Sequence, residues 1–306
     1  LAADPAAEYQ MIETKPSAKS ISPEERRPAS VYFEAVASAD QPTTFHLTAE
    51  FTQWPRVNRV LHYQARPVGP DHPVRRNWTA EQPPALVFTG ELRAQYREAA
   101  GEDRNPARVA RALYQWVISN IRYMENDKAG LLDRPAVAAL ARRAGGAEEI
   151  SLLFVSLCRL GGIPARPVSG WLLVPGCERP WTWAEIYIEP WGWIPADPAM
   201  GACASRDFET LPKEDAARVA DFYFGSLDAW RLVTADDIQN PLFPEKRGFR
   251  QNPLFLQRGE MEWADGENLP FGEFQCKLEV TEIAPYTPKV TPAPPAPAEP
   301  PEPSSP

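Results

Sequence analysis

The spacing of apolar residues changes along the chain and divides it into segments of different character. Over positions 1–29, prolines stand among polar residues with neither the helical nor the strand period, which predicts an extended leader. From position 30, apolar and polar residues alternate in three runs: 30–39, 43–54 and 59–68. The second run places Phe45, Leu47, Ala49 and Phe51 on one face. Strands with turns and no helices between them predict a small antiparallel β domain over 30–100.

Helical spacing begins near position 105. Asn105 followed by Pro106 is a favourable N-cap and first-turn pair. Four apolar residues then recur at helical intervals: Val109, Leu113, Val117 and Ile121. The pattern therefore predicts an amphipathic helix that ends near Tyr123.

Two more helices and three strands are predicted after this helix. Asp133 with Pro135 starts a shorter helix, which the glycine pair at 145–146 stops, and a third helix covers 147–160. Alternation then predicts strands over 165–174, 181–189 and 193–198. Helices and strands in this order predict an α+β fold, with a core of helices on an antiparallel sheet over 104–235.

The last part of the chain carries weaker signals. Residues 236–283 mix aromatic and polar positions irregularly and are predicted to form a C-terminal extension. Residues 284–306 are nearly half proline, a composition that favours polyproline II and builds no core of its own. We interpret this stretch as a proline-rich tail.

Length, charge and hydropathy restrict the class of protein. A chain of 306 residues with 43% apolar residues is long enough for about two globular domains. A net charge of -9 argues against a surface for nucleic acid or anionic lipid. No run approaches the ~18 apolar residues of a membrane span. Because the first residue is Leu1 and not Met, we expect a processed or truncated chain whose lost segment was a signal peptide or an anchor.

The four cysteines form neither a disulfide framework nor a CxxC zinc motif, so we predict no metal and no cofactor. Cys158 falls in an apolar helical run, which is typical of a buried thiol. Cys177 and Cys203 stand in turn-like surroundings, and whether they pair in an oxidising compartment is left open.

Three motifs in the middle of the chain carry a family resemblance. ARALYQWVISNIRY is followed by RRAGGAEEISLLFVSLCRLGGIPARPVSGW and then by WTWAEIYIEPWGWIPADP. In order and spacing they resemble the core of the transglutaminase-like fold, which is shared with papain-like cysteine enzymes. The resemblance covers about 106–201, and the later FGSLDAWR is similar to the segment that follows in bacterial members.

The resemblance implies a catalytic triad that this sequence has lost. In the family, a thiol at a helix N-terminus attacks a carbonyl, a neighbouring imidazole activates it, and a carboxylate orients the imidazole. The positions that match are Ala147 for the cysteine, Trp181 for the histidine and Asp197 for the carboxylate. Only the carboxylate is chemically equivalent, so we expect a pseudoenzyme without transglutaminase or protease activity.

Substitutes for the lost groups are few. The histidines, His46, His62 and His72, all lie in the predicted β domain. Ser151 lies one helical turn after Ala147 but has no partner base, and Cys158 lies deeper in the same helix.

Two other functions remain open. The series Trp171, Trp181, Trp183, Trp191 and Trp193 is typical of a carbohydrate- or peptide-binding module. A hydrolase with relocated chemistry would use the carboxylates of Glu148, Glu149, Glu185 and Asp197, for which structural roles are the stronger interpretation.

The leading interpretation is a non-catalytic protein-binding or scaffold subunit of a larger assembly, possessing no transmembrane segment and no affinity for nucleic acid. By analogy with exported bacterial relatives, we expect an extracytoplasmic location, periplasmic or within a membrane-associated complex. The indole of Trp181 is expected to plug the old cleft or to contact a partner. The other candidate partner contacts are Trp191, Pro294 and Pro295.

Overall fold

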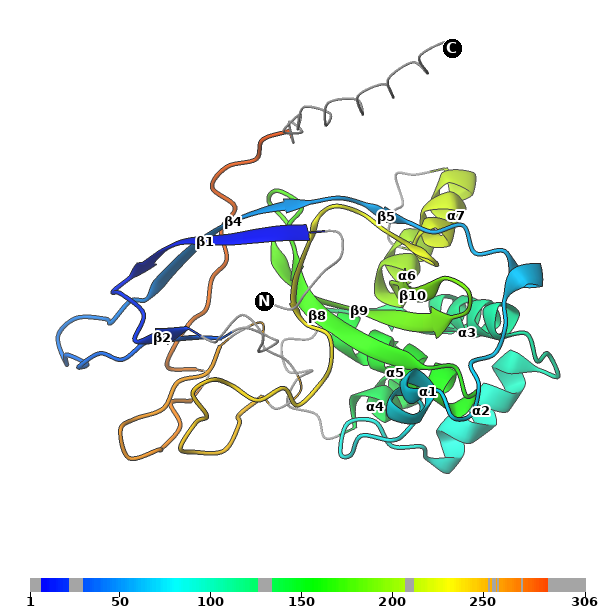
Figure 1. Cartoon of the computed structure of the whole chain (residues 1–306), viewed down its shortest axis with the longest axis horizontal. Helices are drawn as coiled ribbons and strands as arrows, with labels where there is room; N and C mark the ends of the chain where they lie inside the picture. Colours follow the sequence, from blue (N-terminus) through cyan, green and yellow to red (C-terminus); the bar gives the residue numbers. More distant parts are fainter. Residues whose placement is uncertain are drawn as a thin grey trace, which may run out of the picture.

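A four-stranded antiparallel sheet organises the core (Figure 1). The structure is a computed structural model that describes residues 7–21, 30–125, 134–206, 212–252, 254, 257, 259–270 and 272–285. The strand order is β10-β9-β8-β12, formed by Gly192–Ala196, Arg179–Ile188, Ala165–Leu172 and Arg231–Ala235. The first three strands fall on the three predicted ones. With helices packed on this sheet, the α+β class is confirmed.

Helix α5 (Ala147–Leu160) packs against β8 and β9 and forms the centre of the hydrophobic core. Helices α2 (Gly90–Ala100), α3 (Pro106–Asn120), α4 (Pro135–Arg142) and α6 (Pro198–Arg206) surround its other sides. Because α5 has neighbours on all sides, every residue from Glu149 to Arg159 is buried. Burying a large side chain such as Phe154 stabilises the fold by about 1.5–3 kcal/mol.

Capping explains why the start of α3 was predicted correctly. The side chain of Asn105 accepts hydrogen bonds from the backbone N–H groups of Ala107 and Arg108, both at 3.1 Å, and starts α3 as predicted. The helix ends at Asn120, slightly earlier than predicted, because Tyr123 already belongs to β6 (Arg122–Tyr123). This strand pairs in parallel with β7 (Ala144–Gly145), directly before α5.

Within the predicted extended leader, residues 7–15 form strand β1 (Ala7–Lys15), a regular element that the sequence analysis did not predict. This strand pairs antiparallel with β4 (His46–Gln53), and the two form a long ribbon beside the helical part (Figure 1). The sequence of β1 lacks a clear alternation, because pairing with a strand far along the chain, and not a period of its own, specifies it. The register shifts between Met11 and Glu13, as at a β-bulge.

The predicted segment 30–100 contains helices as well as strands, which corrects the all-strand interpretation. Of the run 59–68, three residues form a short 3-10 helix, η1 (His62–Gln64). Helices α1 (Pro73–Trp78) and α2 follow; in α2 only Leu92, Gln95 and Ala100 are buried, too few for a clear period. The remaining elements are β2 (Ser20–Ile21), β3 (Val31–Tyr32), β5 (Arg56–Val57), α7 (Lys213–Phe222) and β11 (Ser226–Leu227). The division into domains stays a prediction.

Carboxylates, not regular backbone pairing, hold the C-terminal extension together. Among its described residues, the backbone pairing is limited to an isolated bridge between Glu262 and Asn268. The carboxylate of Glu262 accepts hydrogen bonds from the backbone N–H groups of Arg247 and Gly248 at 3.0 and 2.9 Å. Most of the predicted proline-rich tail, with Pro294 and Pro295, lies outside the described residues. Within the described ranges, no helix combines the length and apolar character needed to cross a bilayer.

Candidate functional site

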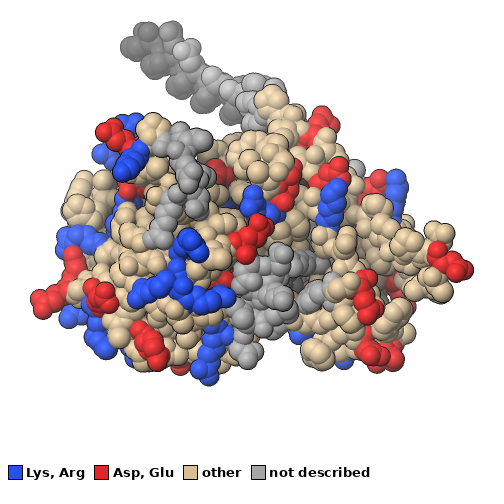
Figure 2. All heavy atoms as spheres, turned by 180° about the vertical axis from the view of Figure 1, so that it is seen from behind, with Lys and Arg blue, Asp and Glu red and all other residues tan. Residues whose placement is uncertain are grey.

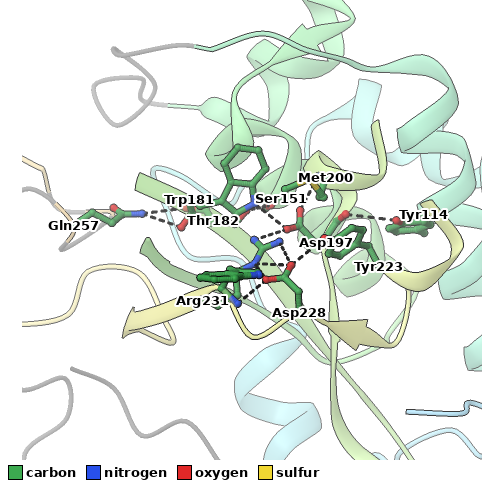
Figure 3. Close-up of polar contacts among 11 residues, drawn as sticks. Tyr114, Ser151, Trp181, Thr182, Asp197, Met200, Tyr223, Asp228, Arg231 and Gln257 are labelled. Atoms are coloured by element: carbon green, nitrogen blue, oxygen red, sulfur yellow. Dashed lines mark hydrogen bonds and ion pairs between the residues drawn. The ribbon is translucent and has the colours of Figure 1, made fainter. Parts of the chain in front are cut away.

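The residues that match the family triad lie at the ends of three core elements. Ala147 is the first residue of α5, Trp181 lies in β9, and Asp197 directly follows β10. The indole Nε1 of Trp181 donates a hydrogen bond to Oδ2 of Asp197 at 2.8 Å (Figure 3). Ser151, one turn into α5, donates its hydroxyl proton to the carbonyl oxygen of Thr182 at 2.9 Å. This bond fixes the start of α5 beside the strand that carries Trp181.

The carboxylate of Asp197 is fully buried and accepts two further hydrogen bonds. Nη1 of Arg231 donates to the same Oδ2 at 2.8 Å, and the backbone N–H of Met200 donates to Oδ1 at 2.8 Å. Neither Asp197 nor Arg231 has exposed side-chain surface (0% each). An indole and a guanidinium thus occupy the carboxylate oxygen that faces β9.

Arg231 is shared with a second carboxylate. Its Nη2 donates to Oδ2 of Asp228 at 2.8 Å, and its Nε contacts both oxygens of that carboxylate at 3.1 and 3.2 Å. The hydroxyl of Tyr223 and the backbone N–H of Trp230 also donate to Asp228, at 2.9 and 2.8 Å. One buried cation therefore lies between two carboxylates, at the edge of the sheet where β12 begins (Figure 3).

The pKa values of this cluster follow its burial and charges. Burial raises the pKa of Asp197 above its ordinary value, although Arg231 opposes the shift. Burial also acts upward on Asp228, but the charge and hydrogen bonds of Arg231 outweigh it and lower the pKa. Burial alone would lower the pKa of Arg231; the two carboxylates outweigh it and raise the pKa above its usual value. The guanidinium is therefore charged at every working pH.

Aromatic and amide groups close the space around Trp181. Its ring lies 5.3 Å from that of Tyr123, measured between centroids. The side-chain amide of Gln257, in the C-terminal extension, donates to Oγ1 of Thr182 at 3.2 Å (Figure 3). Trp181 is 2% exposed and Ala147 8%. The indole is consequently packed inside the protein and offers no surface to a partner, so its predicted role as a partner contact does not fit this packing.

A carboxylate occupies the N-terminus of α5. Glu149 accepts a hydrogen bond from the backbone N–H of Gly146 at 2.8 Å and forms an ion pair with Arg142. An acidic side chain here complements the helix dipole. The sequence interpretation of this glutamate as structural agrees with these contacts.

Glu185, another member of the carboxylate set, is also paired with cations. It forms ion pairs with Arg56 and with Arg166, the latter at 2.7 Å, and its side chain is 5% exposed. Among the described residues no group of three or more His, Cys, Asp or Glu side chains could hold a metal ion. Glu148 is half-buried in the first turn of α5. Paired with arginines, the carboxylates of Glu149, Glu185 and Asp197 do not resemble an acid and base facing one substrate.

The histidines lie away from the core cysteine. His46 and His62 are exposed, and Nδ1 of His72 accepts a hydrogen bond from the backbone N–H of Val74 at the start of α1. Cys158 is fully buried, and burial raises the pKa of its thiol, which disfavours the reactive thiolate. Cys177 is an exposed free thiol while Cys203 is buried, and no disulfide joins these two described residues.

Three of the five tryptophans in the predicted series are core residues. Trp171, Trp181 and Trp183 are 7%, 2% and 1% exposed, and Trp191 packs, partly buried, against the core. Trp193 lies edge-on to Trp78, with ring centroids 5.7 Å apart. Trp191 thus keeps some surface for a partner.

Sequence reasoning missed Asp228 and Arg231. Their segment, FGSLDAWR, was noted only for its resemblance. The sequence did hold a signal for them: Asp228 and Arg231 carry opposite charges, are three positions apart and stand among apolar and aromatic residues. The role of Arg231 depends on the pairing of β12 with β8, which brings its guanidinium beside Asp197.

Part of the chain is similar to known proteins. Residues 93–198 match the sequence model of the Transglutaminase-like superfamily. An uncharacterised protein of Haemophilus influenzae is 24% identical in an alignment of 157 positions, with a coverage of 42% of this chain and 42% of the relative. The chain thus matches less than half of that relative's length.

Two solved structures are similar at a low level. A candidate cysteine protease from Cytophaga hutchinsonii has a TM-score of 0.41 and 18% identity over 65% of this chain and 68% of the other. The periplasmic domain of TgpA from Pseudomonas aeruginosa has a TM-score of 0.34 and 18% identity over 49% and 52%. From the matched residues and the motifs within them, we conclude that this chain carries a core of the transglutaminase-like superfamily over residues 93–198.

Proposed function

We propose that this protein is a non-catalytic member of its superfamily that acts as a protein-binding or scaffold subunit of a larger assembly. The observation that carries the proposal is the hydrogen bond from the indole of Trp181 to Asp197. The carboxylate that would orient an imidazole is thus bound to an indole, which accepts no proton. At the other end of the site, Ala147 supplies no nucleophile.

Burial supports the same conclusion from the substrate's side. A glutamine or peptide carbonyl must approach the N-terminus of α5, but Ala147 is 8% exposed and Trp181 2%. The carboxylate of Glu149 already binds the backbone N–H of Gly146 at this helix end. An anionic side chain at this end also opposes a developing oxyanion.

The location of the protein belongs to the same proposal. We place it outside the cytoplasm, in the periplasm or in a membrane-associated complex, as expected from its resemblance to exported bacterial proteins. Fractionation of the native source, with detection by antibody, tests this location. Recovery in the cytoplasmic fraction alone would contradict it.

Assays of the purified chain test the absence of catalysis. Incorporation of a fluorescent amine into casein measures acyl transfer, and release of ammonia or peptides measures hydrolysis. We expect neither above the buffer blank, with an active transglutaminase and papain as positive controls. Turnover that Asp197→Asn lowers, at unchanged near-UV circular dichroism, would refute the proposal. Ser151→Ala is assayed as the second variant, because Ser151 carries the hydroxyl nearest to Ala147 along α5.

A further inference from the structure

Three arginines lie close together in the backbone where α4 ends and the strand pair β6–β7 begins. We propose that this arginine rim, consisting of Arg122, Arg142 and Arg143, binds a short acidic segment of a partner protein. The inference rests on the proposed binding function and deepens it, because it names a surface and the chemistry of the partner. All three arginines are exposed.

Backbone pairing brings the rim together. Arg122 lies in β6 and pairs in parallel with Ala144 of β7, and its backbone N–H donates to the carbonyl oxygen of Arg143 at 3.0 Å. Arg142 is the last residue of α4. Arg143 follows in the left-handed conformation, with φ of 53°, so the chain turns sharply between helix and strand. Two neighbouring backbone segments thus bring the three arginine positions next to one another.

Among the described residues, the contacts of Arg122 and Arg143 are with uncharged groups. The guanidinium of Arg143 lies over the ring of Trp116 at 5.0 Å and contacts Oε1 of Gln95 at 3.4 Å. Nη2 of Arg122 contacts the sulfur of Met124 at 3.2 Å. An indole, an amide and a thioether carry no charge. A guanidinium held against an aromatic ring keeps N–H groups for binding a carboxylate and loses less entropy when it binds.

Arg142 is partly compensated. Its partner is Glu149, whose side chain has no exposed surface, while Arg142 itself is 50% exposed. The ion pair anchors one side of the guanidinium and leaves its other side at the surface. The carboxylate in contact with the rim is thus buried and already bound to Gly146.

Charge decides the class of partner. The chain has a net charge of -9, and on the rear face acidic side chains lie among the Lys and Arg side chains (Figure 2). A long polyanion, such as nucleic acid or an anionic bilayer, extends far beyond a three-arginine area and meets the acidic remainder. A short acidic peptide fits the arginine rim, because acidic groups of the protein farther from it than one Debye length, ~8 Å at physiological salt, are screened. Carboxylates also match the fork of arginine.

Fluorescence anisotropy with labelled hexaglutamate tests the inference on the full chain. We expect saturable binding at 20 mM salt that weakens at least tenfold at 300 mM, because the contacts are exposed ion pairs. The Arg122→Glu/Arg143→Glu variant should weaken binding at least tenfold at 20 mM. The Arg122→Lys/Arg143→Lys variant should weaken it less, since charge remains but the bidentate geometry is lost.

Arg97→Glu is the control outside the rim, and it is compared with the single variant Arg143→Glu, which changes the net charge by the same amount. Arg97 is an exposed arginine on α2, two residues from Gln95 and so on a different side of that helix. The substitution changes net charge without touching the rim, and we expect less than a twofold effect; thermal unfolding curves confirm that each variant folds. Four results would overturn the inference: no binding of hexaglutamate, equal weakening by Arg97→Glu, equal binding of hexaserine, or rim-dependent binding of phosphatidylserine vesicles without binding of the peptide. None of them bears on catalytic turnover, so the two proposals fail separately.

Discussion

Replacement of Arg231 by Met should test whether the buried cluster stabilises the fold. The substitution keeps an unbranched apolar side chain but removes the cation that donates to Asp197 and Asp228, each at 2.8 Å. Asp197 would remain with 0% exposure and no cation. Breaking a fully buried ion pair from one side costs about 3–5 kcal/mol of folding stability. Asp228 moderates the loss, since its side chain is 20% exposed and retains water.

Equilibrium urea denaturation followed by tryptophan fluorescence measures the loss. The matched control is Arg218→Met, which breaks an exposed pair with Asp215 whose side chains are 78% and 48% exposed. Such pairs contribute at most about 1 kcal/mol. The double variant Arg231→Met/Asp197→Asn should be less destabilised than the sum of its single variants, because the uncompensated charge is gone.

The dependence on pH gives a second check on the same variant. Burial already raises the pKa of Asp197, and without Arg231 this pKa rises further. A carboxyl whose folded pKa lies above its unfolded value loses stability as pH rises through the folded pKa. The cost of Arg231→Met should therefore be larger at pH 8 than at pH 5. A loss below about 1 kcal/mol, or one equal at both pH values, would refute the reasoning.

Three other predictions use the same cluster and the core. Trp181→Phe removes an indole N–H that donates to a buried carboxylate, whereas Nε1 of Trp183 has no partner among the described residues. In urea unfolding, Trp181→Phe should therefore lower the free energy of unfolding by about 1–2 kcal/mol more than Trp183→Phe does, and equal decreases would contradict this. Because the folded pKa of Asp228 is lowered from 3.8, its stabilisation exists above that pH and is lost below it; the cost of Asp228→Asn should shrink between pH 7 and pH 3 in denaturation curves. Iodoacetamide should label Cys177 in the native protein and Cys158 only after unfolding, as peptide mass mapping would show.

The core elements were predictable because local and global signals agree in them. Helix α5 begins at Ala147 and ends at Leu160, both as predicted, since a glycine pair precedes it and another follows. Strands β8 and β9 were visible through alternation, although both of their faces are buried. In β9, large and small buried side chains alternate, which preserves the period of two.

Elements that depend on distant partners were not predictable. Strand β1 was assigned to a leader, because its pairing with β4 cannot be read from its own composition. Helix α2 has a good N-cap in Thr89, whose hydroxyl accepts from the backbone N–H of Leu92 at 3.4 Å, but few apolar residues for the core. The periodicity that marks a helix was therefore missing from its sequence.

The candidate site likewise has one part that was predictable from the sequence and one part that was not. The motifs predicted which residues stand at the three matched positions, and Trp181 and Asp197 are indeed in contact. That Arg231 joins them was beyond prediction, because it requires the register that pairs Arg231 with Leu172 across β12 and β8. Short-range patterns locate positions in a fold, whereas the charges that meet in its interior depend on strand register.

The contacts of Asp197 give the proposed loss of catalysis a physical form. In an active triad one protonated imidazole supplies both a hydrogen bond and a positive charge to the carboxylate. Here two side chains from different strands divide these tasks: the indole of Trp181 donates one hydrogen bond, and Arg231 donates another together with the charge. Restoring a histidine at position 181 alone would leave the guanidinium bound to the carboxylate. The contacts that would make this carboxylate structural are therefore distributed over β9 and β12, and on the proposed function a single substitution at position 147 or 181 would not restore catalysis.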